Sequence, residues 1–584
     1  MLNNRESTNK LFSLTNLLIC SFLVLGFIGI VNHELWQDEM QAWTIARDSS
    51  SIADLLKNLK YEGHPALWYL CLRFLNWFTD NPSIMQVFHL VLATINICIF
   101  VIFSPFTKLQ KLLFTFGYFP FYEYNILSRN YNLGVLLIFS FCALFFTRRT
   151  SYFPLAIILA LLAHTNVFGL ILGIVLQLTL LLEIFTNINL NANLTIKRWD
   201  FIASLLIVIV SIVGAIIQLR PPSSGVQGNL IAPDTTVWQT IFAQVSNLNR
   251  LMELNSNIWK AYFPIYQFSS WLEDITLISL AVVFCSIVLK ILIRRPVTRF
   301  LSLAISALLI FILALDKPNF LILEAVNTPA LLGSLVSGAI LFFLGSWFIQ
   351  QPVIFCLYIS GTLGIFLFTY FIYFSDNLRH TGHFFLLFLV CLWLQKSREL
   401  YGGLVLPIPL KALGEGFKNK VITLIFLINL ITGIIAYTND LIRPFSMSKA
   451  TSNYLKNTEL DKLPIMGVPD ERISALSGYL NQKIYYPQSD RWGSFIIWDS
   501  QRKHITARDI VESSGDIPLV KRNILKQVNK IVQTHPTDII LVSTAPINFK
   551  IPSLKITPIK QFVANTIGRE KSYRLYLIQK EIPE

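Results

Sequence analysis

Long apolar runs separated by short polar segments dominate the chain from its N-terminus to about residue 440. A helix needs about 20 apolar residues to cross ~30 Å of hydrocarbon, and runs of this order recur. They lie at 11–32, 84–106, 131–147, 152–186, 201–219, 272–292, 299–315, 329–349, 353–374, 384–395 and 421–438. The run 152–186 is long enough for two crossings, split near 166–169. The pattern predicts a mainly α-helical, polytopic transmembrane bundle.

Two shorter apolar segments, 64–79 and 111–127, make the number of crossings depend on how the chain folds before Ser128. Three apolar segments lie between the first outer loop and Ser128, where parity allows two crossings. Either 64–79 and 84–106 form one crossing with a re-entrant part, or the loop at 108–111 departs from the charge rule described next. The pattern predicts about 13 crossings.

Lysines and arginines gather in the short polar segments at the ends of alternate crossings. Such residues are retained on the cytoplasmic side. The groups are Arg5/Lys10, Lys108/Lys111, Arg148/Arg149, Lys197/Arg198, Lys290 with Arg294/Arg295/Arg299, and the stretch 396–420. With these groups inside, every crossing from residue 128 onward is consistent. We therefore expect a multi-pass protein of the cell (inner or plasma) membrane, with a cytoplasmic N-terminus and an extracytoplasmic part after about residue 439.

The first apolar run is expected to stay in the protein as a helix, because it is long enough to span and no small-residue cleavage site precedes Trp36. Two long outer loops follow the pattern of helices lying at the interface. In 33–63, Trp36, Met40 and Trp43 recur at helical spacing. In 220–271 the corresponding run is Trp238, Phe242, Val245, Leu248 and Met252.

The C-terminal part differs in kind from the rest of the chain. Short β-like runs at 483–486, 494–498, 538–542 and 573–578 alternate with helical patterns near 470–481 and 519–533. This alternation predicts a small α/β extracytoplasmic domain at 445–584. The preceding 1–444 would form the transmembrane domain, with its outer loops at 33–63 and 220–271.

Composition agrees with the membrane assignment. Hydrophobic residues make up 54% of the chain and charged residues only 14%, where soluble proteins carry roughly 25% charged residues. The formal net charge of +14 fits cytoplasmic loops and attraction to anionic lipid. Because no basic stripe with interleaved aromatic residues accompanies it, we expect no nucleic-acid partner. All seven cysteines lie in apolar segments, where they act as small hydrophobic residues.

Two polar motifs lie just outside predicted crossings. The segment 36–43, WQDEMQAW, places Asp38 and Glu39 directly after the first span. A solvated acidic helix start is one interpretation, because carboxylates complement a helix N-terminus. The segment 62–70, EGHPALWYL, places Glu62 and His64 at the same outer level, with a proline suited to the first turn of a helix.

These two motifs together resemble the GT-C glycosyltransferase superfamily. An acidic pair soon after the first span, followed by a His-Pro-x-Leu-x-Tyr-Leu helix start, is similar to protein O-mannosyltransferases and aminoarabinose-transferase-like enzymes, the glycosyltransferase family 39-like group. The resemblance covers the membrane part and leaves the C-terminal part unmatched. It implies transfer of a sugar from a polyprenyl-phosphate donor to a glycan, lipid or protein acceptor at the outer face of the membrane. It also implies that Asp38 activates or orients the acceptor, and we name Asp38 and its neighbour Glu39 as the candidate catalytic residues.

Further outer residues suit a phosphate–sugar site by type. Arg129 and Tyr131 follow Ser128 at one span boundary, and Arg379 and His380 lie at another. Arginine presents a planar fork to phosphate oxygens, although lipid-headgroup contact is the alternative for Arg129. His164 lies at the outer end of a span, where bonding to a neighbouring helix is the alternative. We name Glu62, His64, Arg129, Tyr131, His164, Arg379 and His380 as candidate substrate-binding residues.

The sequence leaves the cofactor open. The outer histidines have no His-x-x-x-His spacing, and the pair His380 and His383 lacks a third ligand nearby in sequence. A hard divalent cation held by Asp38 and a phosphate is the metal site most in keeping with the residue types.

Two other functions fit a polytopic membrane protein. A transporter or flippase for lipid-linked sugars is expected to carry charged residues at mid-bilayer and repeated halves, whereas the polar groups here lie at the outer boundary and no halves repeat. A non-catalytic cell-envelope assembly protein would use its C-terminal part to bind a partner. A single displacement with inversion needs one catalytic carboxylate, so we expect an inverting glycosyltransferase with Asp38 as base or acceptor-orienting residue.

Overall fold

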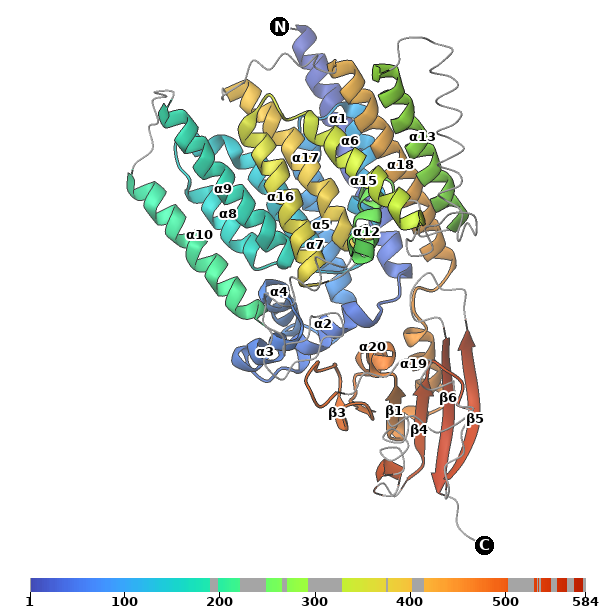
Figure 1. Cartoon of the computed structure of the whole chain (residues 1–584). Helices are drawn as coiled ribbons and strands as arrows, with labels where there is room; N and C mark the ends of the chain where they lie inside the picture. The colour runs from blue at the N-terminus through green and yellow to red at the C-terminus, as the bar shows by residue number, and fades with distance from the viewer. Residues whose placement is uncertain are drawn as a thin grey trace.

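The computed structural model describes a helical bundle with a sheet domain at one end. The described residues are 2–189, 198–220, 248–264, 270–292, 328–373, 377–401, 414–502, 530–532, 534, 537–547, 554–563 and 572–580. The N-terminus lies at the end of the bundle opposite the sheet domain (Figure 1). The expected run at 299–315, and Trp238, Phe242 and Val245, lie outside the described residues.

The bundle is built from long apolar helices in chain order. They are α1 (Leu2–Asn32), α5 (Ser83–Phe103), α7 (Tyr131–Leu144), α8 (Phe153–Ala163), α9 (Val167–Asn189), α10 (Arg198–Leu219), α13 (Ser270–Leu292), α15 (Thr328–Ser346), α16 (Pro352–Phe371), α17 (Leu378–Tyr401) and α18 (Glu415–Ile442). Within the described residues, eight helices are long and apolar enough to cross a membrane. The predicted polytopic, mainly α-helical bundle is confirmed.

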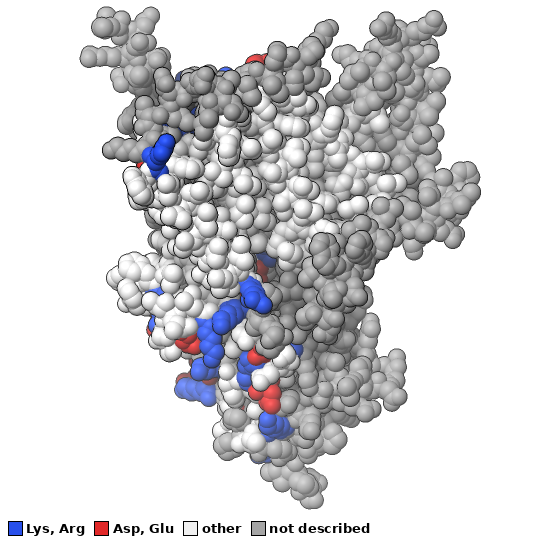
Figure 2. Space-filling view, turned by 60° about the vertical axis from the view of Figure 1, so that its left-hand side comes forward, with Lys and Arg blue, Asp and Glu red and all other residues white. Residues whose placement is uncertain are grey.

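The outer surface of the bundle suits contact with lipid. Large apolar side chains are exposed on it, among them Val24 (57%), Val210 (69%) and Phe342 (79%). Figure 2 shows a broad area of the bundle surface without charged side chains. Most of the charged side chains visible in this view lie nearer the sheet domain. Lipid tails tolerate such a surface and water does not, so the pattern of exposure supports membrane insertion.

The stretch before Ser128 folds as one of the two alternatives left open by the sequence. Helix α4 (Leu67–Asn76) has ten residues and measures ~15 Å, half of the hydrocarbon thickness, so 64–79 adds no crossing beside α5. The chain then returns through α6 (Lys108–Thr115) and the π-helix η2 (Tyr118–Ile126). The start of α6 lies beside α18, because Gln110 donates to the carbonyl of Asn419. The loop at 108–111 therefore keeps to the charge rule.

The first outer loop forms α2 (Gln37–Asp48), α3 (Ile52–Asn58) and the short helix η1 (Leu59–Tyr61) at the sheet-domain end of the bundle (Figure 1). Helix α2 lies where the spacing of Trp36, Met40 and Trp43 predicts a helix. Its apolar stripe, however, packs against protein: Met40 and Trp43 are fully buried, among side chains of α4 and of the C-terminal helix α20 (Asp470–Leu480). In the other long loop, Leu248 and Met252 belong to α12 (Leu248–Ser256).

The C-terminal part forms a six-stranded sheet in the order β3-β2-β1-β4-β6-β5. Strand β1 pairs in parallel with β2 and β4, and the remaining pairs are antiparallel. Helices α19 (Ser448–Asn457) and α20 accompany the sheet. The strands are β1 (Ile465–Val468), β2 (Ile484–Tyr486), β3 (Arg491–Gly493), β4 (Ile539–Ser543), β5 (Leu554–Val563) and β6 (Ser572–Lys580). The predicted small α/β fold is confirmed.

Individual elements of this sheet differ from the prediction. The expected strands at 483–486, 538–542 and 573–578 correspond to β2, β4 and β6. The run 494–498 is irregular instead, because its backbone bonds to the first outer loop rather than to a strand. Most of the helix expected near 519–533 lies outside the described residues.

Candidate active site

Asp38 lies in the first turn of α2, at the end of the bundle where the sheet domain docks. One of its carboxylate oxygens, Oδ2, forms ion pairs with Nη1 of Arg129 and with Nη1 of Arg379, the latter at 3.1 Å. Arg129 comes from the loop between η2 and α7, and Arg379 from the first turn of α17. Three elements far apart in the sequence thus bring one carboxylate and two guanidinium groups together.

This cluster is partly open to solvent. The side chain of Asp38 is 21% exposed, and those of Arg129 and Arg379 are 12% and 15% exposed. Such exposure is enough for a ligand atom to reach the charges, while the surrounding protein lowers the local dielectric and strengthens their interaction. The Nε atom of Arg379 is buried without a hydrogen-bond partner among the described residues.

Glu39, the neighbour of Asp38, has different surroundings. It is completely buried. Its Oε2 lies 3.0 Å from Nε2 of His33 and accepts the Trp36 amide N–H at 3.2 Å, while its Oε1 accepts the Ser128 amide N–H at 2.5 Å. The two carboxylates that are adjacent in sequence therefore face different groups, Asp38 the arginines and Glu39 the interior.

His33 joins Glu39 to the end of α18. Its Nδ1 lies 2.7 Å from Oδ2 of Asp440, so its two ring nitrogens face two carboxylates. Burial would lower the pKa of His33, but Asp440 and Glu39 outweigh burial and raise the pKa to about 10. The imidazolium form is therefore the stable one at neutral pH, donating one hydrogen bond to each carboxylate.

An aromatic ring lies beside the guanidinium group of each arginine, and His89 contacts the backbone of the loop that carries Arg129. Arg379 lies 5.6 Å from the ring centre of Trp36, and Arg129 lies 5.8 Å from that of Tyr131. The ring nitrogens of His89, on α5, lie 2.8 and 2.9 Å from the carbonyl oxygens of Asn125 and Arg129. These contacts fix where the guanidinium groups point.

Tyr131 and His380 form a buried layer next to the arginines. The Tyr131 hydroxyl lies 2.8 Å from Nε2 of His380. The rings of His380 and His383 stack on Phe168, with ring centres 5.3 and 4.4 Å away. Because Tyr131 and His380 are only 2% and 5% exposed, their contacts run mainly to protein.

Glu62 and His64 lie in the loop that precedes α4. Glu62 accepts a hydrogen bond from the Gln41 amide at 2.8 Å and one from the Trp498 side chain, and burial raises its pKa to about 7. Burial, with Arg129 and Arg379 nearby, lowers the pKa of His64 to about 3. A neutral imidazole at His64 follows, with its Nδ1 buried and lacking a partner among the described residues.

The sheet domain reaches this loop through the segment 494–498. The Gln41 side chain donates to the carbonyl of Ile496 at 2.8 Å and accepts its amide N–H at 2.9 Å. Ser494 donates to the Asp48 carboxylate at the other end of α2. Since Asp38 and Gln41 are three residues apart, they share a helix face, and the docked segment lies about one turn from the Asp38 carboxylate.

His164 has different neighbours from the Asp38 cluster. It follows the last residue of α8, its side chain bonds to Gln218 of α10, and its carbonyl accepts the Leu67 amide at 3.2 Å. The structure thus brings Asp38, Arg129 and Arg379 into direct contact and places Glu62 and His64 within their electrostatic reach. It places His164 at the junction of α8, α10 and α4.

Four residues that the sequence reasoning assigned no role contribute to this region: His33, Asp440, Gln41 and Trp498. Asp440 carried one signal, because a carboxylate at the end of an apolar run is costly unless it has a partner. The contacts of Gln41 and Trp498 join segments more than 400 residues apart, and a single sequence carries no signal for such a pairing.

The residues around Asp38 do not fit a divalent cation. Within the described residues, no group of three or more His, Cys, Asp or Glu side chains is arranged to hold a metal ion. The Asp38 carboxylate already faces two guanidinium groups, whose positive charge opposes a dication. The same charges favour an anion beside Asp38.

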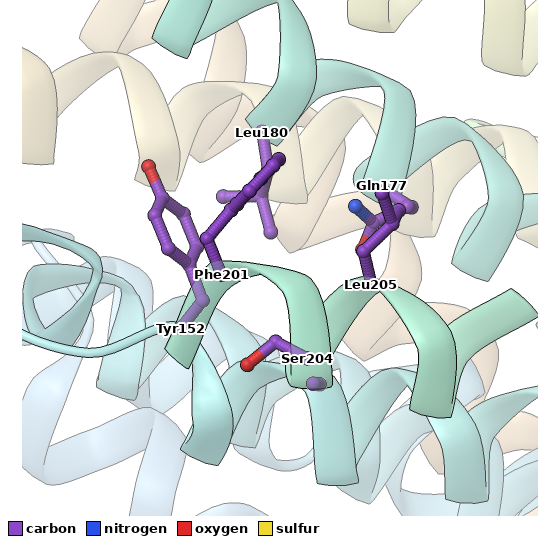
Figure 3. Close-up of a pocket in the computed structure, with 7 residues that line it drawn as sticks. Tyr152, Gln177, Leu180, Phe201, Ser204 and Leu205 are labelled. Atoms are coloured by element: carbon purple, nitrogen blue, oxygen red, sulfur yellow. The ribbon is translucent and has the colours of Figure 1, made fainter. Parts of the chain in front are cut away.

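A small pocket lies elsewhere, between α8, α9 and α10 (Figure 3). Its lining is mainly apolar, with Tyr152, Gln177 and Ser204 as the polar members. It contains none of the candidate residues.

The chain is distantly similar in structure to a solved membrane protein. No protein-family model matches the chain, and no curated protein matches it. Among solved structures, the chain is similar to the crystal structure of ArnT from Cupriavidus metallidurans bound to undecaprenyl phosphate, with 10% sequence identity and a TM-score of 0.38. The likeness covers 96% of this chain and 97% of that chain.

Proposed function

We propose that this chain is a glycosyltransferase that moves a sugar from a polyprenyl-phosphate donor to an acceptor at the outer face of the membrane. The observation that carries the proposal is the partly exposed Asp38 carboxylate between Arg129 and Arg379. A carboxylate suits the activation of an acceptor hydroxyl. Paired arginines suit the phosphate that departs in this reaction.

The position of the cluster supports a donor that is a lipid. Arg129 lies in the loop just before α7 and Arg379 in the first turn of α17, and both helices belong to the apolar bundle, so a phosphate there can keep its polyprenyl chain in the bilayer. The N-terminus and the start of α18, with their basic residues, lie at the opposite end (Figure 1). The positive-inside rule then puts the cluster and the sheet domain outside the cytoplasm.

The reaction is a single displacement. The acceptor oxygen attacks the anomeric carbon of the donor sugar, the bond from that carbon to the phosphate oxygen breaks, and the acceptor proton passes to the Asp38 carboxylate. Polyprenyl phosphate leaves with the electron pair and is retained by Arg129 and Arg379. One displacement inverts the anomeric centre. No step needs a metal ion, in keeping with the residues around Asp38.

Binding of the donor changes the partners of Asp38. In the structure Asp38 pairs with both arginines, and a donor phosphate competes for the same guanidinium groups. As the phosphate takes them, Asp38 becomes available to the acceptor hydroxyl. The neutral imidazole of His64 lies in the same electrostatic neighbourhood and suits a hydrogen bond to an uncharged sugar or acceptor hydroxyl.

The test is transfer by the full chain reconstituted in vesicles. Wild-type protein is incubated with undecaprenyl-phosphate-linked sugars and a membrane extract as the source of acceptor, and the lipids are analysed by mass. Conversion of a lipid-linked sugar to undecaprenyl phosphate by the wild type, lost in Asp38→Asn, is expected. Full conversion by Asp38→Asn would overturn the proposal. Movement of the lipid-linked sugar across the bilayer without conversion would favour a flippase instead.

A further inference from the structure

Two parallel links join α2 to the loop that carries Arg129. In the first, the Asp38 side chain pairs with the Arg129 side chain. In the second link, Glu39 accepts the Ser128 amide N–H at 2.5 Å. Glu39 follows Asp38 on α2, and Ser128 precedes Arg129 in the loop. The second link is buried, so it sets the spacing between the two segments independently of solvent and of any bound ligand.

Glu39 itself has no oxygen left to offer a substrate. Both of its oxygens accept hydrogen bonds inside the protein, from His33, from the Trp36 amide and from the Ser128 amide, and its side chain has no exposed area. It acts on the reaction only through the groups that it holds.

His33 anchors Glu39 to the rest of the bundle and to the second arginine. Asp440 holds the other ring nitrogen of His33, and Phe445 packs on the His33 ring with centres 4.9 Å apart. Phe445 also packs on Trp36 at 5.7 Å, the ring on which Arg379 lies. The buried network of Glu39, His33 and Asp440 therefore supports the positions of both arginines.

A network of this kind is sensitive to the loss of a single partner. Charged groups buried without a partner are strongly unfavourable, and a binding constellation loses affinity when its groups shift by roughly 0.5 Å. Glu39, His33 and Asp440 have no direct access to the donor, yet a change in any of them moves the loop at Ser128 and with it Arg129.

We propose that Glu39 is a positioning residue whose carboxylate, held by His33 and Asp440, sets Arg129 against Asp38 at the spacing that receives the donor phosphate. This inference rests on the proposed function. It assigns different roles to the two adjacent acidic residues: Asp38 contacts the substrate, and Glu39 positions Arg129, which contacts the donor phosphate.

The test measures binding of undecaprenyl phosphate to the full chain in detergent, for Glu39→Gln, Arg129→Ala and the double variant. Glu39→Gln is expected to weaken binding about tenfold, as for the loss of a hydrogen bond to a charged group. In the Arg129→Ala background the same substitution is expected to have a clearly smaller effect, because residues that act through one another are not additive and only the placement of Arg379 through Trp36 remains to be disturbed. A merely structural role would weaken binding by the same factor in both backgrounds.

Glu183→Gln is the matched control. Glu183 is also a buried glutamate in an ion pair, with Arg148 at 2.9 Å, but it lies on α9 away from the cluster. It is expected to leave binding unchanged. If Glu39→Gln does not fold, as judged by its elution and thermal midpoint, Asp440→Asn takes its place. That change keeps an oxygen for His33 but removes the charge, and a smaller loss of binding is expected, again reduced in the Arg129→Ala background.

The outcomes separate this inference from the proposed function. If the wild type binds undecaprenyl phosphate and Glu39→Gln binds it with the same dissociation constant, the positioning role alone is overturned. Equal losses of affinity from Glu39→Gln in the wild-type and Arg129→Ala backgrounds would also overturn it. An absence of binding by the wild type would overturn the proposed function and the positioning role together.

Discussion

The guanidinium group of Arg379, at the start of α17, lies 3.1 Å from the carboxylate of Asp38, in the first turn of α2. Arg129 pairs with the same carboxylate oxygen. Two guanidinium groups held this close repel each other, and Asp38 reduces that repulsion. A phosphate can do the same, so Asp38 and a donor phosphate are expected to compete for the arginines.

Replacing Asp38 by asparagine separates binding from transfer. The variant keeps the size of the side chain but loses its charge, so the arginines are left for the phosphate. We expect undecaprenyl phosphate to bind at least as tightly as to the wild type, while transfer falls by about 10²- to 10⁴-fold, the usual effect of losing a general base. Titration with undecaprenyl phosphate and the vesicle transfer assay measure the two quantities. Weaker binding together with normal transfer would contradict the role given to Asp38.

Replacing Arg379 by glutamine is expected to weaken binding of undecaprenyl phosphate. Loss of a charge-assisted hydrogen bond costs about 1.5–3 kcal/mol, or roughly 10- to 100-fold in the dissociation constant. Arg443→Gln is the control, since Arg443 follows α18 at the same end of the bundle and is exposed to solvent. Equal effects of the two substitutions would indicate general attraction of the lipid to positive charge, without a specific phosphate site.

Glu62 makes stability depend on pH. Its pKa is raised from 4.5 to about 7, chiefly by burial, so between these values the folded protein holds a proton that the unfolded chain has released. The free energy of unfolding therefore falls as the pH rises through this window, and Glu62→Gln should remove this part of the fall. Thermal midpoints in detergent from pH 5 to pH 8 measure the difference.

The comparison of wild type and Glu62→Gln cancels the contribution of His64. The pKa of His64 is lowered from 6.5 to about 3, so His64 makes the protein more stable as the pH rises between these values, in both proteins alike. Glu253→Gln, which changes an exposed glutamate on α12, is expected to follow the wild type. Parallel curves of thermal midpoint against pH for wild type and Glu62→Gln would show that burial does not raise the pKa of Glu62.

Replacing Gln41 by leucine is expected to loosen the sheet domain from α2. Leucine has a similar size but neither donates to nor accepts from Ile496. The Ile496 amide should then exchange its hydrogen roughly tenfold faster, as for the loss of about 1–1.5 kcal/mol of hydrogen bonding. Hydrogen exchange followed by mass analysis of peptides covering 494–498 measures this. Gln86→Leu, which removes a contact to the carbonyl of Ile30 instead, should leave these peptides unchanged.

The sequence determined the helical bundle, because lipid imposes a pattern that can be read locally. A segment that crosses hydrocarbon must be apolar over about 20 residues, and each such segment identifies itself without reference to its neighbours. Arg129 and Arg379 stood out by residue type, since arginine suits phosphate oxygens and both lie at predicted outer ends of spans. Motif and position together singled out Asp38.

The tertiary structure decided which groups the side chains of Asp38 and Glu39 contact. Adjacent residues on a helix point about 100° apart, so only one of the two can face the arginines, and the sequence does not say which. The pairing of His33 with Asp440, and of Gln41 with Ile496, joins segments more than 400 residues apart. Such contacts depend on how whole helices and the sheet pack, so the sequence supplied the charged groups and the fold decided which of them meet.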